Sequence, residues 1–269
     1  MQEPCGERFE ELVRIMERLR AEGGCPWDRE QTRESLKPFL IEEAYEVVEA
    51  IDQGDPKQLM TELGDLLFQV VFHAQVATER REFTIGEILA ATADKMVRRH
   101  PHVFADATAS TTREVLEQWE DLKREERDAA TGTPASALDG VPKELPSLLR
   151  AQRLQDKASR AGFDWPEISG VIAKVEEELG ELNAAIRGAV SEEVELELGD
   201  MLFSLVNLAR FLNLSAEEAL RKSIMRFVTR FHYIEETVAR GGRRLREVGL
   251  DEMERLWQDA KSPSRVPPA

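Results

Sequence analysis

Cysteine is scarce in this chain, which contains only Cys5 and Cys25. The two residues have no metal-binding spacing, and so few cysteines in 269 residues are typical of a protein from a reducing compartment. The first residues also lack the charged-then-apolar pattern of a signal peptide. Together these absences predict a cytoplasmic protein.

Basic residues are also in short supply. The chain has 36 Lys and Arg against 52 Asp and Glu, which gives a formal charge of −16. A surface of this sign repels the phosphates of nucleic acids and of anionic membranes, so we expect neither as a general partner. The charge balance still allows a local basic pocket for a small phosphate ligand.

Long apolar runs are missing as well. The most apolar stretch, residues 66–77, is too short to cross a bilayer and contains Gln69, His73 and Gln75. No segment alternates apolar and polar residues for long enough to form a convincing strand. With 42% hydrophobic and 33% charged residues, the composition is that of a soluble globular protein with a substantial core.

The chain instead shows helical spacing of its apolar side chains, which predicts an all-α fold. Residues 25–32 are expected to form a loop, and Pro101 is expected to end the helix before it. The expected helices cover residues 7–22, 32–53, 56–80, 85–99 and 112–127 in the first half, and 169–186, 192–212, 216–240 and 251–261 in the second.

Residues 128–147 divide the chain. They are rich in Gly, Pro, Ser and Ala and have no apolar period, so we interpret them as an interdomain linker. The predicted domains are residues 1–127 and 148–262, and residues 263–269 are expected to be a disordered tail.

The same pattern of carboxylates occurs once in each half. Residues three or four apart share one face of a helix, and the members of each copy are symmetric about Gly54 or Ala189. Two antiparallel helices joined at these points would bring four carboxylates together. The pattern comprises Glu42, Glu43, Glu46, Glu62 and Asp65, and again Glu177, Glu178, Glu181, Glu197 and Asp200.

Carboxylates placed this closely repel one another unless a cation neutralises them. These carboxylates also lie within apolar helices, where an unpaired charge is costly. Gly64 and Gly199 lower helix propensity at matching positions, which suggests close packing or ligand approach. Hard oxygen ligands suit Mg²⁺, with Mn²⁺ as a substitute. The predicted metal ligands are Glu43, Glu46, Glu62 and Asp65, and Glu178, Glu181, Glu197 and Asp200.

The two halves correspond in further respects. Equivalent carboxylates lie 135 residues apart, as Glu46 and Glu181 do, and residues 163–166 (FDWP) answer residues 26–28 (PWD). A near-constant offset of this kind indicates a tandem duplication.

Cations and tryptophans also recur in both halves. Pairs of cations four residues apart share a helical face and would bind the outer oxygens of a metal-bound polyphosphate, and each tryptophan would stack on a base. Taken alone, the cations are more typical of an exposed helix surface and the tryptophans of core packing. The residues are Lys95, Arg99, Trp119 and Lys123, and Arg226, Arg230, Trp257 and Lys261.

Nearly the whole chain resembles the MazG nucleoside triphosphate pyrophosphohydrolases, whose tandem domains carry EExxE…ExxD. The segments CPWD, ELGDLLFQVVFHA, RRHPHVF, QWEDLKREE and LDGVPKELPSLLRAQRLQDKASRAGFDW carry the resemblance. It implies two all-α helical-bundle domains, a homodimer, and Mg²⁺-dependent hydrolysis of NTPs and dNTPs to the monophosphate and pyrophosphate. It also implies a broad substrate range and a role in cleaning the nucleotide pool.

Carried over by position, the resemblance assigns the second half more firmly to catalysis than the first. The family usually has Lys where this chain has Arg226, and the first half has Phe39 where the second has Lys174. Glu177, next to Glu178, is our candidate for activating the attacking water, with Glu42 as its counterpart. The implied metal ligands are Glu178, Glu181, Glu197 and Asp200, and the implied nucleotide contacts are Lys174, Arg226, Arg230, Trp257 and Lys261.

Three alternatives compete with this interpretation. Di-iron carboxylate bundles use Glu-x-x-His, and no histidine follows these glutamates at that spacing. A non-catalytic nucleotide-sensing or protein-interaction module would keep the fold, but the complete carboxylate sets in both halves argue against it. Helical dUTP-specific and phosphoribosyl-ATP pyrophosphohydrolases are closer, but the duplication and the CPWD and HPHVF segments favour the MazG type.

Overall fold

A computed structural model of the chain describes residues 5–106, 108–112, 114, 115, 118, 119, 122, 123, 126 and 136–261. Every regular element within these residues is helical, which confirms the predicted all-α class. The chain forms two compact units, Met1–Val115 and Leu116–Ala269. None of the described helices is both long and apolar enough to cross a membrane.

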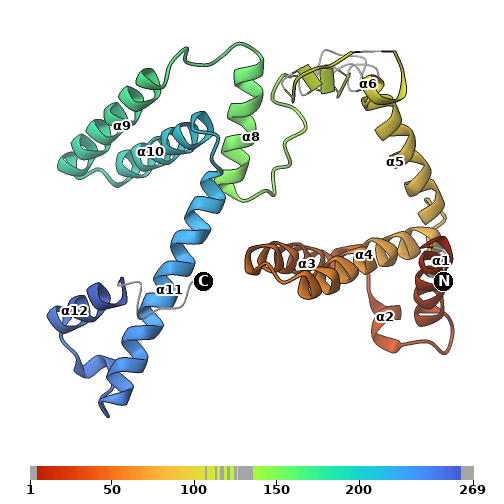
Figure 1. The fold of residues 1–269 in the computed structure, drawn as a ribbon, viewed down its shortest axis with the longest axis horizontal. Helices are drawn as coiled ribbons and strands as arrows, with labels where there is room; N and C mark the ends of the chain where they lie inside the picture. The colour runs from red at the N-terminus through yellow and green to blue at the C-terminus, as the bar shows by residue number, and fades with distance from the viewer. Residues whose placement is uncertain are drawn as a thin grey trace. The chain divides into compact units, whose positions relative to one another are not determined.

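The first unit is built on an antiparallel helical hairpin (Figure 1). The hairpin consists of α3 and α4, and α1 packs against α4 on one side. Its core contains Met16, Leu36 and Phe72, all nearly inaccessible to solvent. The elements are α1 (Cys5–Arg20), α2 (Pro26–Glu30), α3 (Arg33–Gln53), α4 (Pro56–Glu79), α5 (Ile85–Arg99) and α6 (Pro101–Phe104).

Local sequence explains the ends of this hairpin. Thr32 caps the start of α3, since its side chain accepts a hydrogen bond from the backbone N–H of Ser35. Gly54 ends the helix with a φ of 69°, a left-handed conformation that glycine adopts at little cost. Asp55 then caps α4 and Pro56 occupies its first turn. The predicted interruption between the helices 32–53 and 56–80 is therefore confirmed.

The second unit contains a matching hairpin of α9 and α10, with α8 packed against α10 (Figure 1). A separate small core lies where α12 packs on α11, and it contains Ile234, Val238 and Val248. The elements are α8 (Ser147–Arg160), α9 (Ile168–Gly188), α10 (Ser191–Phe211), α11 (Ala216–Arg240), the short 3-10 helix η1 (Leu245–Glu247) and α12 (Leu250–Ala260).

The turn of the second hairpin has a different residue from the first. Ala189 ends α9 with a φ of 57°, in the left-handed region where Gly54 stands in the first unit. A Cβ atom makes this conformation costly, so packing of the two helices must hold the turn in place.

The predicted helix limits hold to within about two residues for most described elements. The predicted loop at residues 25–32 is wrong, because Pro26–Glu30 forms α2, in which Pro26 occupies the first turn and Asp28 follows it. Pro101 does end α5 at Arg99, but it also begins the short helix α6. Helix α8 was not among the predicted helices.

Several predictions fall on residues that are not described. The tail 263–269, the first part of the linker (128–135) and much of the expected helix 112–127 lie outside the described residues. The predicted domain limits, 1–127 and 148–262, stay predictions.

Candidate functional site

Three carboxylates of the second unit meet between α9 and α10. Glu178 comes from α9, while Glu197 and Asp200 come from α10, one turn apart. Each contributes an oxygen, and these oxygens all lie within 4.8 Å of one another. Glu178 is only 5% exposed. The antiparallel hairpin thus brings its residues level across the helix pair, as their symmetry about Ala189 predicts.

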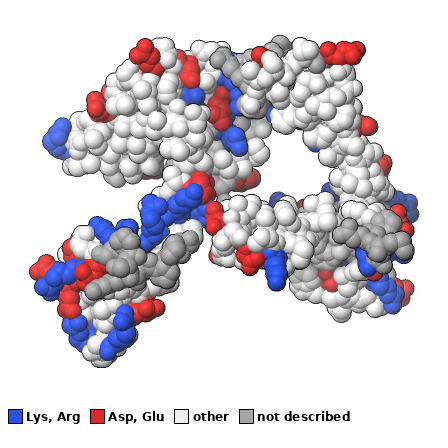
Figure 2. All heavy atoms as spheres, viewed as in Figure 1, with Lys and Arg blue, Asp and Glu red and all other residues white. Residues whose placement is uncertain are grey.

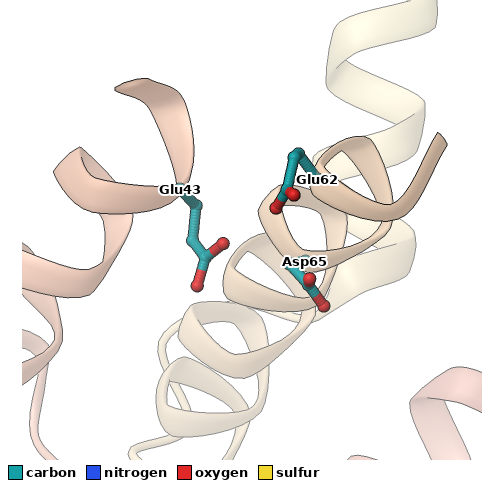
Figure 3. Close-up of side chains that lie close together, drawn as sticks. All are labelled: Glu43, Glu62 and Asp65. Carbon is teal, nitrogen blue, oxygen red and sulfur yellow. The ribbon is translucent and has the colours of Figure 1, made fainter. Parts of the chain in front are cut away.

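The first unit repeats this arrangement with Glu43, Glu62 and Asp65. In Figure 3, Glu43 extends from α3 into the space between the helices, toward Glu62 and Asp65 on α4. Their nearest oxygens again lie within 4.8 Å of one another. We call these two groups the first and second carboxylate trios.

The fourth predicted ligand of each set lies farther out. Neither Glu46 nor Glu181 belongs to the group whose oxygens approach within 4.8 Å. Both are still near enough to act electrostatically, since the charge of Glu46 raises the pKa of Glu43 and that of Glu181 raises the pKa of Glu197. A fourth carboxylate therefore borders each trio without completing it.

Burial and like charge disturb ionisation at both trios. Burial is the largest cause that raises the pKa of Glu197, followed by the charges of Glu181 and Asp200. Burial likewise raises the pKa of Glu43, followed by the charge of Asp65. Carboxylates that repel one another in this way offer hard oxygen donors to a divalent cation, and both trios are consistent with metal binding.

A lysine already contacts the second trio. The Nζ of Lys174 lies 2.7 Å from Glu178 Oε1 and 3.1 Å from Glu177 Oε1. These hydrogen bonds, with Glu178 the stronger contributor, raise the pKa of Lys174. The Glu177 side chain is 57% exposed. Phe39 occupies the corresponding position of the first unit, so the first trio has no such lysine.

A cavity of about 580 Å³ opens beside the second trio. Its wall includes an ion pair in which Arg210 donates to both oxygens of Asp164, at 2.5 and 3.0 Å. Burial opposes ionisation of Asp164, but hydrogen bonds from Arg210 and Ser159 outweigh it and hold the Asp164 pKa below its usual value. The cavity is lined by Leu138, Leu154, Gln155, Ala158, Phe163, Asp164, Trp165, Lys174, Glu178, Asp200, Phe203, Ser204, Asn207 and Arg210.

Most of this cavity was not predicted from the sequence. Residues 163–166 were recognised only as part of the duplication. The available signal was the polar residues inside otherwise apolar helices, because Ser204 and Asn207 interrupt α10 and are both nearly buried. Buried polar side chains of this kind need partners, and partners can be supplied by a ligand.

Other predicted contacts of the second half gather on α11 and at α12. The Arg230 guanidinium lies 5.6 Å from the centre of the Trp257 ring, and that ring is 5.3 Å from Phe227. Trp257 also packs against the small core of α11 and α12. Arg226 lies one turn before Arg230 and Lys261 directly follows α12. None of these four predicted contacts lines the cavity beside Glu178 within the described part of the chain.

The predicted nucleotide contacts of the first half are divided between the two units. Lys95 and Arg99 lie on α5 of the first unit. Trp119 and Lys123 belong to the second compact unit, where the Lys123 Nζ lies 5.4 Å from the centre of the Trp119 ring. They line a second cavity of about 340 Å³ together with residues of α8, including Arg153.

Comparison with known proteins decides the family. The family profile described as the MazG nucleotide pyrophosphohydrolase domain matches residues 31–104 and again residues 167–234. The chain belongs to the MazG family. Each matched segment contains one carboxylate trio, so both the resemblance and the tandem organisation predicted from the sequence are confirmed.

Relatives in this family match the chain over nearly its full length. The nucleoside triphosphate pyrophosphohydrolase/pyrophosphatase MazG of Thermotoga maritima is 47% identical over 256 residues, which is 95% of this chain and 96% of the relative. The nucleoside triphosphate pyrophosphohydrolase of Escherichia coli K12 is 48% identical over 257 residues, or 94% and 97% of the two chains. The uncharacterized protein YabN of Bacillus subtilis is 44% identical over 96% of this chain, which spans 52% of YabN.

Proposed function

We propose that this chain is a Mg²⁺-dependent pyrophosphohydrolase that converts an NTP or dNTP and water to the nucleoside monophosphate and pyrophosphate. The observation that carries the proposal is the second carboxylate trio, which lies at the wall of a cavity large enough for a small ligand. Family membership and the names of two near-full-length relatives support the reaction type. Broad base specificity, a nucleotide-pool cleaning role and Mn²⁺ as a substitute metal are part of the proposal.

The metal would be held by the carboxylate trio. Glu178, Glu197 and Asp200 offer their oxygens from two facing helices, and Glu181 is close enough to join them. A bound Mg²⁺ would supply neutralising charge to the phosphate oxygens of the substrate. The raised pKa of Glu197 supports this role, because a cation relieves the repulsion that burial strengthens.

The reacting phosphates would be oriented by the chain's own cations. Lys174 lies on the carboxylates of Glu178 and Glu177 and is the basic residue nearest to the trio on α9. Its three donors would turn to the phosphate oxygens when substrate arrives. Arg226, Arg230, Lys261 and the ring of Trp257 form the second group of proposed nucleotide contacts.

Glu177 would hold the proton of the attacking water. Its carboxylate is largely exposed and accepts a hydrogen bond from Lys174, so it lies near the trio without belonging to it. General-base assistance of this kind is typically worth about 10²–10⁴ in rate. A Glu177→Gln protein that binds Mg²⁺ normally and keeps full turnover would exclude this role.

The first trio would act in a weaker or regulatory capacity. It has the three carboxylates Glu43, Glu62 and Asp65, but Phe39 replaces the lysine that faces the second trio. A site without that cation would bind metal yet lack one contact to the phosphates. Lys95 and Arg99 remain its proposed cations.

We further propose that the chain is a homodimer in which apolar faces of the hairpins are covered. Leu196 is 68% exposed and Ile186 55%, and Leu179 and Leu198 are also exposed on α9 and α10. The part of α9 and α10 that faces the viewer in Figure 2 is largely free of charged atoms. Apolar patches of this kind mark interaction sites.

The dimer can be tested by light scattering after gel filtration. Leu196→Asp should convert a dimer to a monomer, while Leu250→Asp at the exposed start of α12 should leave its mass unchanged. A monomeric wild-type chain would exclude the proposal.

The reaction is tested by measuring pyrophosphate and monophosphate release from a panel of NTPs and dNTPs with Mg²⁺. The wild type is compared with the double variants Glu178→Ala/Asp200→Ala and Glu43→Ala/Asp65→Ala, which remove two members of one trio each. We expect loss of turnover in the first variant and partial activity in the second. Orthophosphate as the product, or full activity in both variants, would contradict the proposed reaction or site.

A further inference from the structure

The second cavity, of about 340 Å³, lies against a different face of α8 from the cavity beside the second trio. We call it the α8 cavity and the other the catalytic cavity. We propose that the α8 cavity is an anion site that binds inorganic pyrophosphate without a metal ion, and that its occupation regulates turnover. The binding goes beyond the proposed function and does not depend on it, whereas the regulation rests on that function.

The α8 cavity concentrates positive charge in an acidic chain. Among its described lining residues Asp156 is the one acid, while the cations are Lys123, Arg153, Lys157 and Arg160. The whole chain carries a formal charge of −16. A cleft lined by one sign of charge focuses the potential and attracts ligands of the opposite sign. The cavity therefore suits a compact anion that carries several charges.

Helix electrostatics accounts for only part of this charge. Lys157 and Arg160 lie in the last turn of α8, where cations offset the negative end of the helix dipole. Arg153 lies earlier in the helix, and Lys123 comes from outside it. The end of the helix does not require either of these two cations, and an anionic ligand explains why both line the same cavity.

Arg153 is held only loosely by its neighbour. Its Nη1 lies 3.7 Å from Asp156 Oδ2, which is too long for a hydrogen bond, and its side chain is 61% exposed. Guanidinium groups bind phosphate oxygens through paired N–H donors. Arg153 can therefore turn its donors to a phosphate without breaking a hydrogen bond to Asp156.

Lys123 brings a further cation to the cavity from a different part of the chain. Its Nζ lies 5.4 Å from the centre of the Trp119 ring, and both side chains line the cavity. The family resemblance implies that these two residues contact a nucleotide in the first half, but they belong to the second compact unit. We therefore assign the charge of Lys123 to anion binding beside α8.

The first unit shows that a hairpin of this kind does not need the basic face. Helix α1 packs on α4 as α8 packs on α10. With the offset of 135 residues, Arg18 stands at the position of Arg153, but Glu22 stands at that of Lys157, after α1 has ended at Arg20. The related unit thus folds without this group of cations, which favours a ligand over packing as their reason.

Size and charge both favour pyrophosphate. A volume of 340 Å³ is at the lower end of the range of about 300–1,000 Å³ that is usual for small-molecule sites, so it suits a small ligand better than a whole nucleoside triphosphate. Four cations match the roughly three negative charges of pyrophosphate better than the one to two, roughly, of orthophosphate.

The same elements line both cavities. On α8, Leu154 and Ala158 line the catalytic cavity, while Lys157, between them in sequence, lines the α8 cavity. In the segment before α8, Leu138 lines the catalytic cavity and Gly140 the α8 cavity. We expect a ligand that draws this segment and α8 together to shift the wall of the catalytic cavity, which links binding at the two sites.

Binding is measured by isothermal titration calorimetry of the full chain with pyrophosphate in EDTA, at constant ionic strength. Arg153→Gln/Lys157→Gln should weaken binding by about tenfold or more, because it removes two charge-assisted contacts to phosphate. The matched control is Arg14→Gln/Arg18→Gln, which removes the same charge at the same spacing from α1 and should bind as the wild type does.

A second pair of cations tests whether the anion instead binds at the proposed nucleotide contacts. Arg226 and Arg230 lie on α11, outside the described lining of the α8 cavity. Pyrophosphate binding in EDTA should therefore survive in Arg226→Ala/Arg230→Ala. Loss of binding in this variant, with none in Arg153→Gln/Lys157→Gln, would overturn the proposed site.

Orthophosphate and ADP identify the ligand. ADP carries a diphosphate on a nucleoside, and it should bind about tenfold more weakly than pyrophosphate in EDTA because the cavity is small. Orthophosphate should be weaker by a similar factor, since it offers fewer charges. ADP binding that is as tight as that of pyrophosphate and is lost in Arg153→Gln/Lys157→Gln would overturn pyrophosphate as the ligand.

Regulation is measured as the effect of added pyrophosphate on kcat and KM in buffered Mg²⁺. Pyrophosphate that acts only at the second trio would inhibit the wild type and Arg153→Gln/Lys157→Gln alike. We expect it to change kcat in the wild type and to lose that effect in the variant. The variant should have the kcat of the wild type when no pyrophosphate is added.

The outcomes separate the proposals. If the wild type does not bind pyrophosphate in EDTA, or the Arg153→Gln/Lys157→Gln variant binds it equally well, the anion site is overturned whatever the catalytic result. If no triphosphate is hydrolysed, the proposed function and the regulation fail while the binding stands. If binding is as expected but both proteins are inhibited alike, the regulation alone is overturned. Should the double variant fail to fold, Arg153→Gln, which changes an exposed side chain, decides.

Discussion

Replacing Glu43 by Gln should make the first unit more stable than the wild type when no metal is bound. When metal is bound, the variant should be less stable than the wild type. The nearest oxygens of Glu43, Glu62 and Asp65 lie within 4.8 Å of one another, and Phe39 provides no neighbouring charge where Lys174 stands in the second unit. Removing one of three like charges relieves two repulsive pairs. The same substitution removes a proposed metal ligand.

The size of the effect follows from the separation of the charges. At 4.8 Å a pair of unit charges repels by ~3 kcal/mol at an effective dielectric of 20 and by ~1 kcal/mol in water. Since Asp65 is exposed and Glu43 and Glu62 are partly so, we expect a gain near the lower figure for each of the two pairs, about 2 kcal/mol in total. Magnesium at 100 times its Kd would stabilise the wild type by about 2.7 kcal/mol, and the variant by much less. The order of stability should therefore reverse on adding metal.

Hydrogen exchange of the amides of α3 and α4 measures this locally, without relying on a single unfolding transition for both units. Exchange is compared in EDTA and in Mg²⁺ for the wild type, Glu43→Gln and the control Glu17→Gln, which removes an exposed charge from α1. The pKa of Glu43 is raised, so its repulsion is present above that pKa and is relieved as the pH falls toward 4.5. In EDTA, the difference in stability between the wild type and Glu43→Gln should therefore become smaller as the pH is lowered. An unchanged order of stability in Mg²⁺ would refute the reasoning.

Four further substitutions test other parts of the fold. Gly170→Ala should destabilise the second unit by about 2 kcal/mol in thermal unfolding, because the added Cβ overlaps the indole ring beside it. Ala189→Gly should stabilise it by about 1 kcal/mol in urea unfolding, and Gly54→Ala should destabilise the first unit by a similar amount, since both positions have a positive φ. The lowered pKa of Asp164 means that its ion pair with Arg210 stabilises the fold above pH 3.8 and that this stabilisation is lost as the pH falls through the folded-state value. Hydrogen bonds to charged groups are typically worth about 2 kcal/mol. Asp164→Asn should abolish that acid-dependent loss in urea unfolding measured as a function of pH.

The carboxylate trios could be predicted from the sequence because they depend on helix periodicity and one hairpin turn. Glu178 and Asp200 are symmetric about Ala189, and two antiparallel helices bring them level whatever surrounds them. The outer position of Glu46 and Glu181 could not be read from spacing. Spacing fixes the face of a helix but not the direction of a long, flexible side chain.

The cavity could not be predicted, because it depends on how α8 packs against α10. Gln155 and Asn207 lie 52 residues apart on different helices, and no periodicity relates them. The same holds for Trp119, which the sequence assigned to the first half and which lies in the second compact unit. Contacts between separate elements depend on tertiary packing, which local patterns do not encode.

One aligned position gives the two copies of the hairpin opposite sensitivities to mutation. Phe72 is part of the first core, whereas Asn207, at the same place in the second copy, lines the cavity. In a library of random variants, changes at position 72 would be lost from cells through low protein abundance, while many at position 207 would survive there and fail only in turnover. Selection for abundance alone would drive Asn207 toward an apolar residue, and the persistence of an amide at this position would then report selection for what the cavity binds.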